Sequence, residues 1–179
     1  PPGGPPPPPP PPPVSRAPAA LAEAMDAVNA VVYPAINDGV YRCGFARTQE
    51  AYDAAHAAHA RGMREIDGRL GRSRWLCGDR FTLADVRLFT TLARYDAIYS
   101  IHFKTGFRLA ADFPNLHRFA RDAMRLLADT VDLDFAKEHY YASHRMLNPA
   151  GIVPRGPACD LLGDDADLPP ALTLADLSR

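Results

Sequence analysis

The sequence predicts an all-α fold, a bundle of helices between two segments whose composition does not suit a packed core. Apolar residues recur at steps of three and four along most of the chain, and no run alternates as a half-buried strand does. Eleven of the nineteen prolines lie within residues 1–13. We therefore expect a disordered proline-rich segment over 1–16, a helical domain over 17–157, and an acidic, weakly ordered tail over 158–179.

The composition and charge of the chain limit the kinds of binding partner and the cellular compartment that we expect for it. The formal net charge is −1, which leaves no basic excess for nucleic acid, and charges interrupt the apolar stretches, so we expect no membrane helix. Cys43, Cys77 and Cys159 are widely spaced and odd in number, a pattern typical of a reducing compartment. We expect a cytoplasmic protein. The chain does not begin with Met, so we also expect its natural start, with any organelle-targeting segment, to lie upstream.

The first two helices follow from the spacing of apolar residues. The first should end at Pro34, which has no amide hydrogen to donate, and the second should stop at Gly71. The expected buried face of the first helix is Leu21, Met25, Val28 and Val32. That of the second is Tyr52, Ala55, His59, Met63, Ile66 and Leu70.

The third helix is predicted from its start. Thr82 and Asp85 are placed for a capping box, in which the Thr82 hydroxyl accepts the Asp85 amide and the Asp85 carboxylate accepts the Thr82 amide. From Val86 to Tyr99, apolar side chains occupy more than one face, which favours a central place in the bundle.

Two further helices complete the expected bundle. Pro114 suits the first turn of a helix whose buried stripe runs to Leu127. A shorter helix is expected over 135–143, and Ile152-Val153-Pro154 should leave it as extended chain.

Several stretches resemble one protein family. Residues 75–85, W-L-C-G-D-R-F-T-L-A-D, resemble the L-x-G-D-x-x-T-x-A-D signature of glutathione transferase C-terminal domains. Residues 33–46, Y-P-A-I-N-D-G-V-Y-R-C-G-F-A, resemble a stretch of the glutathionyl-hydroquinone reductases, the xi-class transferases. Further motifs at residues 91–96, 101–104, 112–116 and 139–157 resemble motifs of that family and occur in the same order.

The resemblance implies a glutathione transferase C-terminal-like helical bundle that normally follows a thioredoxin-like domain. In that family a Cys-Pro cysteine attacks the sulfur of a glutathionyl-hydroquinone, hydroquinone leaves, and a second glutathione resolves the mixed disulfide. This chain contains no Cys-Pro and shows polyproline where that domain would stand. We expect a hydroquinone-binding fragment that is inactive alone, with glutathione as co-substrate, no catalytic residue of its own, and a homodimer formed through the helical domain.

Two alternatives stay open beside this interpretation. The chain could be a non-catalytic binding or assembly module, or part of a conventional glutathione S-transferase. An upstream Cys-Pro favours the reductase, an upstream catalytic Ser or Tyr favours the conventional transferase, and a complete gene with neither favours the module.

Tyr41, Tyr140 and Tyr141 are the residues expected to line the hydroquinone pocket. A phenol hydroxyl stays protonated at neutral pH and can donate a hydrogen bond to a quinol oxygen, while its ring supplies an apolar wall. The alternative is three core aromatics with satisfied hydroxyls. Neighbours on a helix point about 100° apart, so the sequence does not say whether Tyr140 or Tyr141 faces the pocket.

Other polar residues have structural interpretations. Cys43 lacks the sequence signals that activate a thiol, so we do not expect it to be the nucleophile. His56 and His59 could share a metal ion, but no third ligand accompanies them, so we predict no metal site. Arg94 and Asp96 lie in an apolar helix, where we expect a buried salt bridge; contact with the glutathionyl group or the pocket is the alternative.

Overall fold

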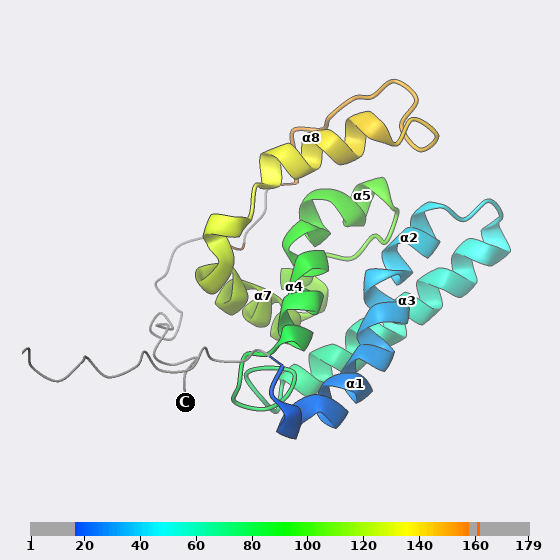
Figure 1. Ribbon diagram of the computed structural model, residues 1–179. Helices are drawn as coiled ribbons and strands as arrows, with labels where there is room; N and C mark the ends of the chain where they lie inside the picture. The colour runs from blue at the N-terminus through cyan, green and yellow to red at the C-terminus, as the bar shows by residue number, and fades with distance from the viewer. Residues whose placement is uncertain (1–16, 158–160, 162–179) are drawn as a thin grey trace, which may run out of the picture.

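The computed structural model describes residues 17–157 and Leu161; the expectations for residues 1–16 and for most of 158–179 lie outside these residues. Within them the chain is helical, and the only β contact is an isolated bridge between Trp75 and Gly78 (Figure 1). The all-α prediction is confirmed. The α-helices are α1 (Ala22–Val31), α2 (Gly39–Gly44), α3 (Gln49–Leu70), α4 (Leu83–Arg94), α5 (Ser100–His102), α6 (Leu109–Asp112), α7 (Pro114–Leu127) and α8 (Leu133–Ser143). The tighter and wider turns are the 3-10 helices η1 (Ala19–Leu21) and η4 (Ala128–Thr130) and the π-helices η2 (Val32–Asn37) and η3 (Tyr95–Tyr99).

The prediction that the first helix ends at Pro34 is wrong. Pro34 lies inside η2, and α2 continues the same rod to Gly44. The Asp38 amide donates to the Tyr33 carbonyl five residues earlier at 2.8 Å, which is the π pattern. The wider turn accommodates a residue that lacks an amide hydrogen and that would crowd an α-helical turn.

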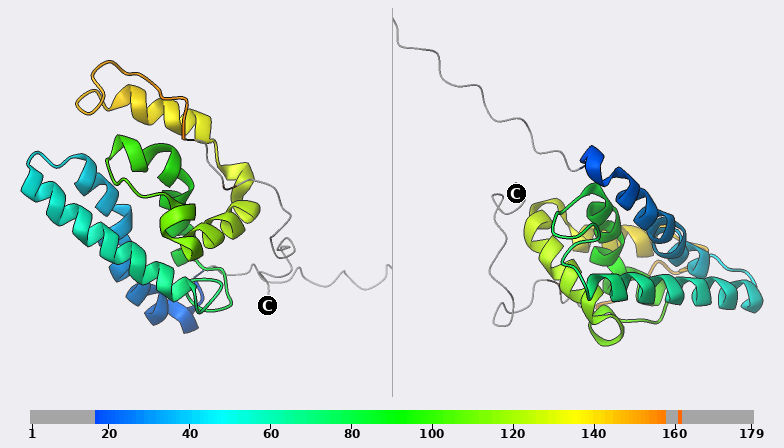
Figure 2. Two further views of the ribbon diagram at one scale, coloured as in Figure 1. Left: turned by 180° about the vertical axis from the view of Figure 1, so that it is seen from behind. Right: turned by 90° about the horizontal axis from the view of Figure 1, so that it is seen from below.

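The rod of α1, η2 and α2 lies alongside α3, as the two views of Figure 2 show. The two rods approach closely because a glycine faces an alanine: a Cβ added at Gly62 would lie 2.3 Å from that of Ala35. Thr48 caps the start of α3, and the helix ends at Gly71 as predicted.

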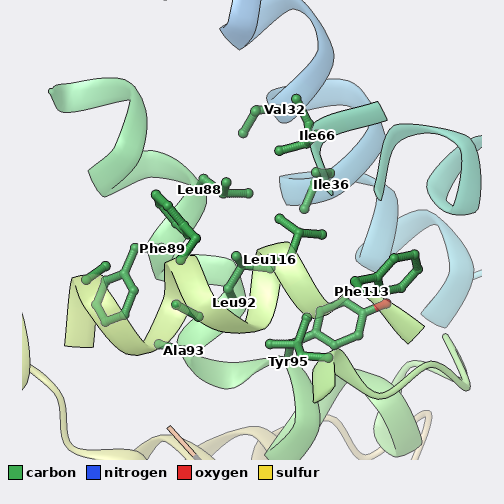
Figure 3. Packing of buried hydrophobic residues seen from close by; sticks show 14 of the residues in the cluster. Val32, Ile36, Ile66, Leu88, Phe89, Leu92, Ala93, Tyr95, Phe113 and Leu116 are labelled. Carbon is green, nitrogen blue, oxygen red and sulfur yellow. The ribbon is translucent and has the colours of Figure 1, made fainter. Parts of the chain in front are cut away.

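Helix α4 occupies the middle of the bundle, as its several apolar faces predict. It packs against α7, against η2, and against η3 and α8. Figure 3 shows side chains from η2, α3, α4 and α7 converging on one core. The labelled members of that core are Val32, Ile36, Ile66, Leu88, Phe89, Leu92, Ala93, Tyr95, Phe113 and Leu116.

The predicted capping box is present at the start of α4. One oxygen of the buried Asp85 carboxylate accepts the Thr82 amide at 2.7 Å and the Thr82 hydroxyl at 2.9 Å. The other oxygen accepts the Leu76 amide at 2.8 Å, so the same side chain also holds the turn before the helix. Gly78 in that turn has φ of 92°, a conformation that glycine adopts without strain.

Helix α7 begins at Pro114 as predicted, and α3 supplies its cap. The Asp67 carboxylate accepts the amides of Asn115 and Leu116, each at 2.9 Å. A carboxylate at a helix N-terminus satisfies free amides and complements the helix dipole. Of the predicted buried stripe, Leu127 is only partly buried.

One expectation about membranes needs a correction. The run Ala19–Gly44 is long and apolar enough to cross a membrane by length and composition, and an 18-residue window within it has a mean hydropathy of 1.2. This is weak evidence, because a core helix of a soluble protein passes the same test. Val28, Val32, Ile36 and Val40 of this run are buried in the bundle core.

Candidate functional site

Three tyrosine hydroxyls from three separate elements meet at one point. Tyr41 comes from α2, Tyr99 from the end of η3, and Tyr140 from α8. The Tyr140 oxygen lies 2.7 Å from the Tyr41 oxygen and 3.0 Å from the Tyr99 oxygen, and the third pair is 3.4 Å apart. We call this group the hydroxyl trio. Because the three residues are up to 99 positions apart in sequence, only the folded bundle creates it.

The hydroxyl trio has one hydrogen to spare. Three hydroxyls carry three hydrogens, and the two short contacts use two of them. The remaining contact, at 3.4 Å, is at the long limit for an O–H···O bond. A ligand oxygen can therefore accept a hydrogen bond from Tyr41 or Tyr99 while both short bonds stay in place.

Aromatic packing holds the hydroxyl trio in place. The Phe103 ring centroid lies 5.0 Å from that of Tyr41, 5.3 Å from that of Tyr99 and 6.1 Å from that of Tyr140. Gly44 makes room for Phe103, since a Cβ added there would lie 2.6 Å from its ring. Burial raises the pKa of both Tyr41 and Tyr99. Their hydroxyls therefore stay protonated at neutral pH and remain donors.

Arg94 places a cation beside the hydroxyl trio. Its guanidinium carbon lies 5.8 Å from the Tyr140 ring centroid and 6.0 Å from that of Tyr99. The expected salt bridge forms at Asp96 but not at Arg94: Asp96 pairs with Arg108 at 3.3 Å and accepts the Leu109 amide at 3.0 Å. Side chains two residues apart on a helix do not face each other, so Arg94 and Asp96 do not pair. The alternative, Arg94 at the pocket, is the arrangement found.

A pocket of about 700 Å³ lies beside Tyr41, Tyr99 and Arg94, between the first rod and α4. Asn37 fixes its wall by donating to the Thr91 hydroxyl at 2.6 Å and to the Arg87 carbonyl at 3.0 Å. The lining residues are Asn29, Tyr33, Asn37, Asp38, Tyr41, Val86, Arg87, Thr90, Thr91, Arg94 and Tyr99. The volume is within the range of small-molecule sites.

The structure separates the two neighbouring tyrosines of α8. Tyr141 lies outside the hydroxyl trio, buried with its ring centroid 4.4 Å from that of His102, and its hydroxyl has no hydrogen-bond partner among the described residues. Consecutive helical residues point about 100° apart, so only Tyr140 reaches Tyr41. A substrate-binding role remains a prediction for Tyr41 and Tyr140, and the placement of Tyr141 does not support one.

Tyr99 is the site residue that the sequence patterns missed. It lies in an apolar stretch, and its burial fits the core position that periodicity predicts. The available signal was its hydroxyl, since a buried tyrosine usually finds a polar partner.

Four histidines, His56, His59, His102 and His144, form hydrogen bonds within the protein. His59 is buried, its Nδ1–H donates to the Ala35 carbonyl at 2.8 Å, and its Nε2 accepts the Tyr95 hydroxyl at 2.7 Å. Burial lowers the pKa of His59 to about 4. His56 bonds to the Thr105 carbonyl, and His102 lies 3.1 Å from His144. The described residues contain no group of three or more metal ligands.

Neither described cysteine has the features of an activated nucleophile. Cys43 is buried, and burial raises the pKa of its thiol to about 11. Burial also raises the pKa of Cys77. A nucleophilic cysteine needs a lowered pKa, so both thiols stay protonated at neutral pH. Cys159 lies outside the described residues.

A family model described as the C-terminal domain of glutathione S-transferase matches residues 49–122. The chain is 48% identical over 148 residues to the glutathionyl-hydroquinone reductase PcpF of Sphingobium chlorophenolicum, and 42% identical over 146 residues to the glutathionyl-hydroquinone reductase YqjG of Escherichia coli. These matches cover 82% and 80% of this chain but 47% and 44% of the relatives. The chain therefore spans about half the length of the curated relatives it matches.

Solved structures agree with the sequence matches. The glutathione-bound structure of YqjG from Escherichia coli matches with a TM-score of 0.78 at 41% identity, covering 82% of this chain and 48% of that one. The Xi glutathione S-transferase of Phanerochaete chrysosporium matches with a TM-score of 0.79 at 38% identity, covering 83% and 49%. Over its helical domain, the chain belongs to the glutathione S-transferase C-terminal domain family, with relatives among the glutathionyl-hydroquinone reductases and Xi-class transferases.

Proposed function

We propose that this chain is the phenol-binding domain of a glutathione-dependent oxidoreductase that reduces glutathionyl-hydroquinones to hydroquinones, and that it is inactive alone. The observation that carries the proposal is the hydroxyl trio of Tyr41, Tyr99 and Tyr140 beside an open pocket. A hydroquinone offers a flat apolar ring and hydroxyl oxygens that can accept the spare hydrogen. The relatives named above carry this reaction in their names.

In this proposal the chain's residues bind and orient the substrate. Tyr41 or Tyr99 donates its hydroxyl hydrogen to a quinol oxygen, which fixes the ring, while Arg94 lies at the same wall. The substrate sulfur must meet a thiolate, and the high pKa of Cys43 makes it unsuitable at neutral pH. The nucleophile is then supplied from outside the described cysteines, together with glutathione.

The non-catalytic binding module remains the second candidate. The observation that favours it is the same protonated state of Cys43 and Cys77, since a module needs no activated thiol. The two candidates differ in whether hydroquinones bind to the pocket.

The first experiment measures binding and turnover on the chain as it stands. Calorimetric titration should detect hydroquinone binding, and a glutathione-dependent assay should detect no release of hydroquinone from a glutathionyl-hydroquinone. Binding without turnover supports the proposed function. Turnover by the chain alone would contradict its predicted inactivity, and loss of that turnover in Cys43→Ser would then identify the nucleophile. Absence of hydroquinone binding would contradict the proposed function and favour the non-catalytic module.

Two substitutions test which hydroxyls bind. Tyr41→Phe and Tyr99→Phe each remove one of the two hydroxyls proposed to donate to the ligand and should weaken hydroquinone binding by about three- to tenfold, the usual effect of one hydrogen bond. Tyr141→Phe is the matched control, because the Tyr141 hydroxyl bonds to no described residue. Equal affinities for all three variants would show that the hydroxyl trio does not bind the ligand.

A further inference from the structure

We propose that the pocket selects its phenolic ligand in the ionised, phenolate form, and that Arg94 makes the selection. This inference rests on the proposed phenol-binding function and specifies the chemical class of ligand, namely phenols made acidic by electron-withdrawing substituents. It begins from the charge balance at the pocket. The charged residues that line it are Asp38, Arg87 and Arg94, which leaves an excess of one positive charge.

Arg94 is a cation that lies beside two tyrosine rings of the hydroxyl trio. Its guanidinium lies about equally far from the Tyr99 and Tyr140 rings, at 6.0 and 5.8 Å. No carboxylate of the described residues forms a salt bridge with it, and its buried Nε has no hydrogen-bond partner there. Arg74 and Arg108 also have a buried guanidinium nitrogen without a hydrogen-bond partner among the described residues, but each forms a salt bridge with an aspartate. Arg94 forms none within the described part of the chain, and an anionic ligand at the pocket would supply its missing counter-charge.

The hydroxyl trio alone does not discriminate between the two forms of a phenol. Its spare hydrogen can be accepted by a neutral phenol oxygen or by a phenolate oxygen, and tyrosine oxygens can also accept from a neutral phenol. Only the phenolate gains the attraction of the guanidinium. The selection is therefore assigned to Arg94, and the hydroxyl trio contributes position.

The size of the effect follows from the distance. Arg94 lies about 6 Å from the Tyr99 and Tyr140 rings, and the proposal places a phenolate oxygen bound to the hydroxyl trio at a similar distance from the guanidinium. Two unit charges at that separation and an effective dielectric constant of about 20 attract enough to shift an equilibrium roughly a hundredfold. Arg94 is partly exposed, and solvent weakens such an interaction, so we expect about a tenfold preference for the phenolate. Further titratable groups near Tyr140 are Tyr41 and Tyr99, which contact its hydroxyl, and His102, which contacts its backbone. His139 and His144 have ring centroids 6.2 and 5.3 Å from its ring.

The experiment uses para-nitrophenol, which ionises near neutral pH and is yellow only as the phenolate. The chain is titrated into the dye at a pH where about half of the free dye is ionised, and the visible absorbance is followed. Wild-type chain should increase the yellow colour, and a pH series should show the pKa of the bound dye lowered by about one unit, which corresponds to the tenfold preference.

Three variants test whether Arg94 is the residue that selects the phenolate. Arg94→Gln should bind the dye without increasing the colour, and Arg94→Lys should keep part of the increase because it keeps the charge. Arg64→Gln removes the same charge from the exposed face of α3 and should behave as wild type. Fluorescence of the single tryptophan, Trp75, which is buried in the core, checks that each variant is folded.

The outcomes separate this inference from the function on which it rests. If wild-type chain binds the dye without changing its ionisation, or binds the neutral form better, the phenolate selection is wrong while phenol binding stands. If neither form binds, the proposed function fails as well. An equal colour increase in wild type and Arg94→Gln would assign the selection to another group.

Discussion

Lowering the pH from about 7 to about 5 should destabilise the folded chain through His59. This side chain is fully buried between α3, η2 and η3, with its Nδ1–H on the Ala35 carbonyl and its Nε2 accepting from Tyr95. Protonation would put a hydrogen on Nε2, which now accepts the hydrogen of the Tyr95 hydroxyl. The folded state therefore binds the proton more weakly than the unfolded state.

The magnitude follows from the two pKa values. Burial lowers the pKa of His59 from 6.5 to about 4, so the unfolded chain takes up a proton first as the pH falls. The stabilisation is fully present above the unfolded pKa and is lost as the pH falls toward the folded pKa. At about pH 5 the unfolded state is almost fully protonated and the folded state is not, which lowers the free energy of unfolding by about 2 kcal/mol relative to pH 7.

The assay is urea unfolding at several pH values, followed by the fluorescence of Trp75. Its ring packs edge-on against Phe81 and Phe119 in the core, so its emission reports loss of packing. The diagnostic variant is His59→Gln, since a glutamine amide can donate to Ala35 and accept from Tyr95 without titrating. His139→Gln, on the exposed side of α8, is the matched control.

His59→Gln should lose about 2 kcal/mol less than wild type between pH 7 and pH 5, while His139→Gln should follow wild type. His102, whose pKa burial also lowers to about 4, contributes in the same direction and leaves a residual pH dependence in both variants. If His59→Gln shows the full wild-type decrease, buried neutral His59 is not a source of acid sensitivity, and the reasoning is refuted.

Three further predictions concern single positions. Asp85→Ala should lower the free energy of unfolding by about 3 kcal/mol, because it leaves the Leu76 and Thr82 donors without their acceptor; urea midpoints will measure this. Gly44→Ala should weaken hydroquinone binding in calorimetry, because its Cβ would displace the Phe103 ring against which Tyr41 packs; unchanged affinity would show that the ring can move freely. Cys43 should resist alkylation by iodoacetamide at about pH 8 in the folded chain and react once urea unfolds it; equally fast labelling in both states would contradict its burial.

The helix boundaries that sequence predicts well are those set by local chemistry. Gly71 ends α3, Pro114 begins α7, and the Thr82 and Asp85 capping box starts α4, each within a few residues of its cause. The Asp67 cap on α7 could not be predicted, because its partners lie 48 and 49 residues away. Local rules locate helix ends, whereas contacts between helices depend on the assembled bundle.

The wrong prediction for Pro34 has its physical origin in a π turn. Pro34 was expected to stop a helix, and it is instead accommodated by the wide turn of η2. A π turn adds one residue to a helical turn, so every later side chain is rotated from its α-helical position. Apolar periodicity does not reveal such an insertion along η3, where all five residues are buried.

The same insertion explains why the candidate site forms. Tyr95 and Tyr99 are four residues apart and would share one face of an α-helix. In η3 they diverge: the Tyr95 hydroxyl donates to His59 on α3, while the Tyr99 hydroxyl reaches Tyr41 on α2 and Tyr140 on α8. The other π turn, η2, contributes Tyr33 and Asn37 to the pocket wall. Both irregular turns therefore border the pocket beside the hydroxyl trio, and π turns in helices are frequent at functional sites.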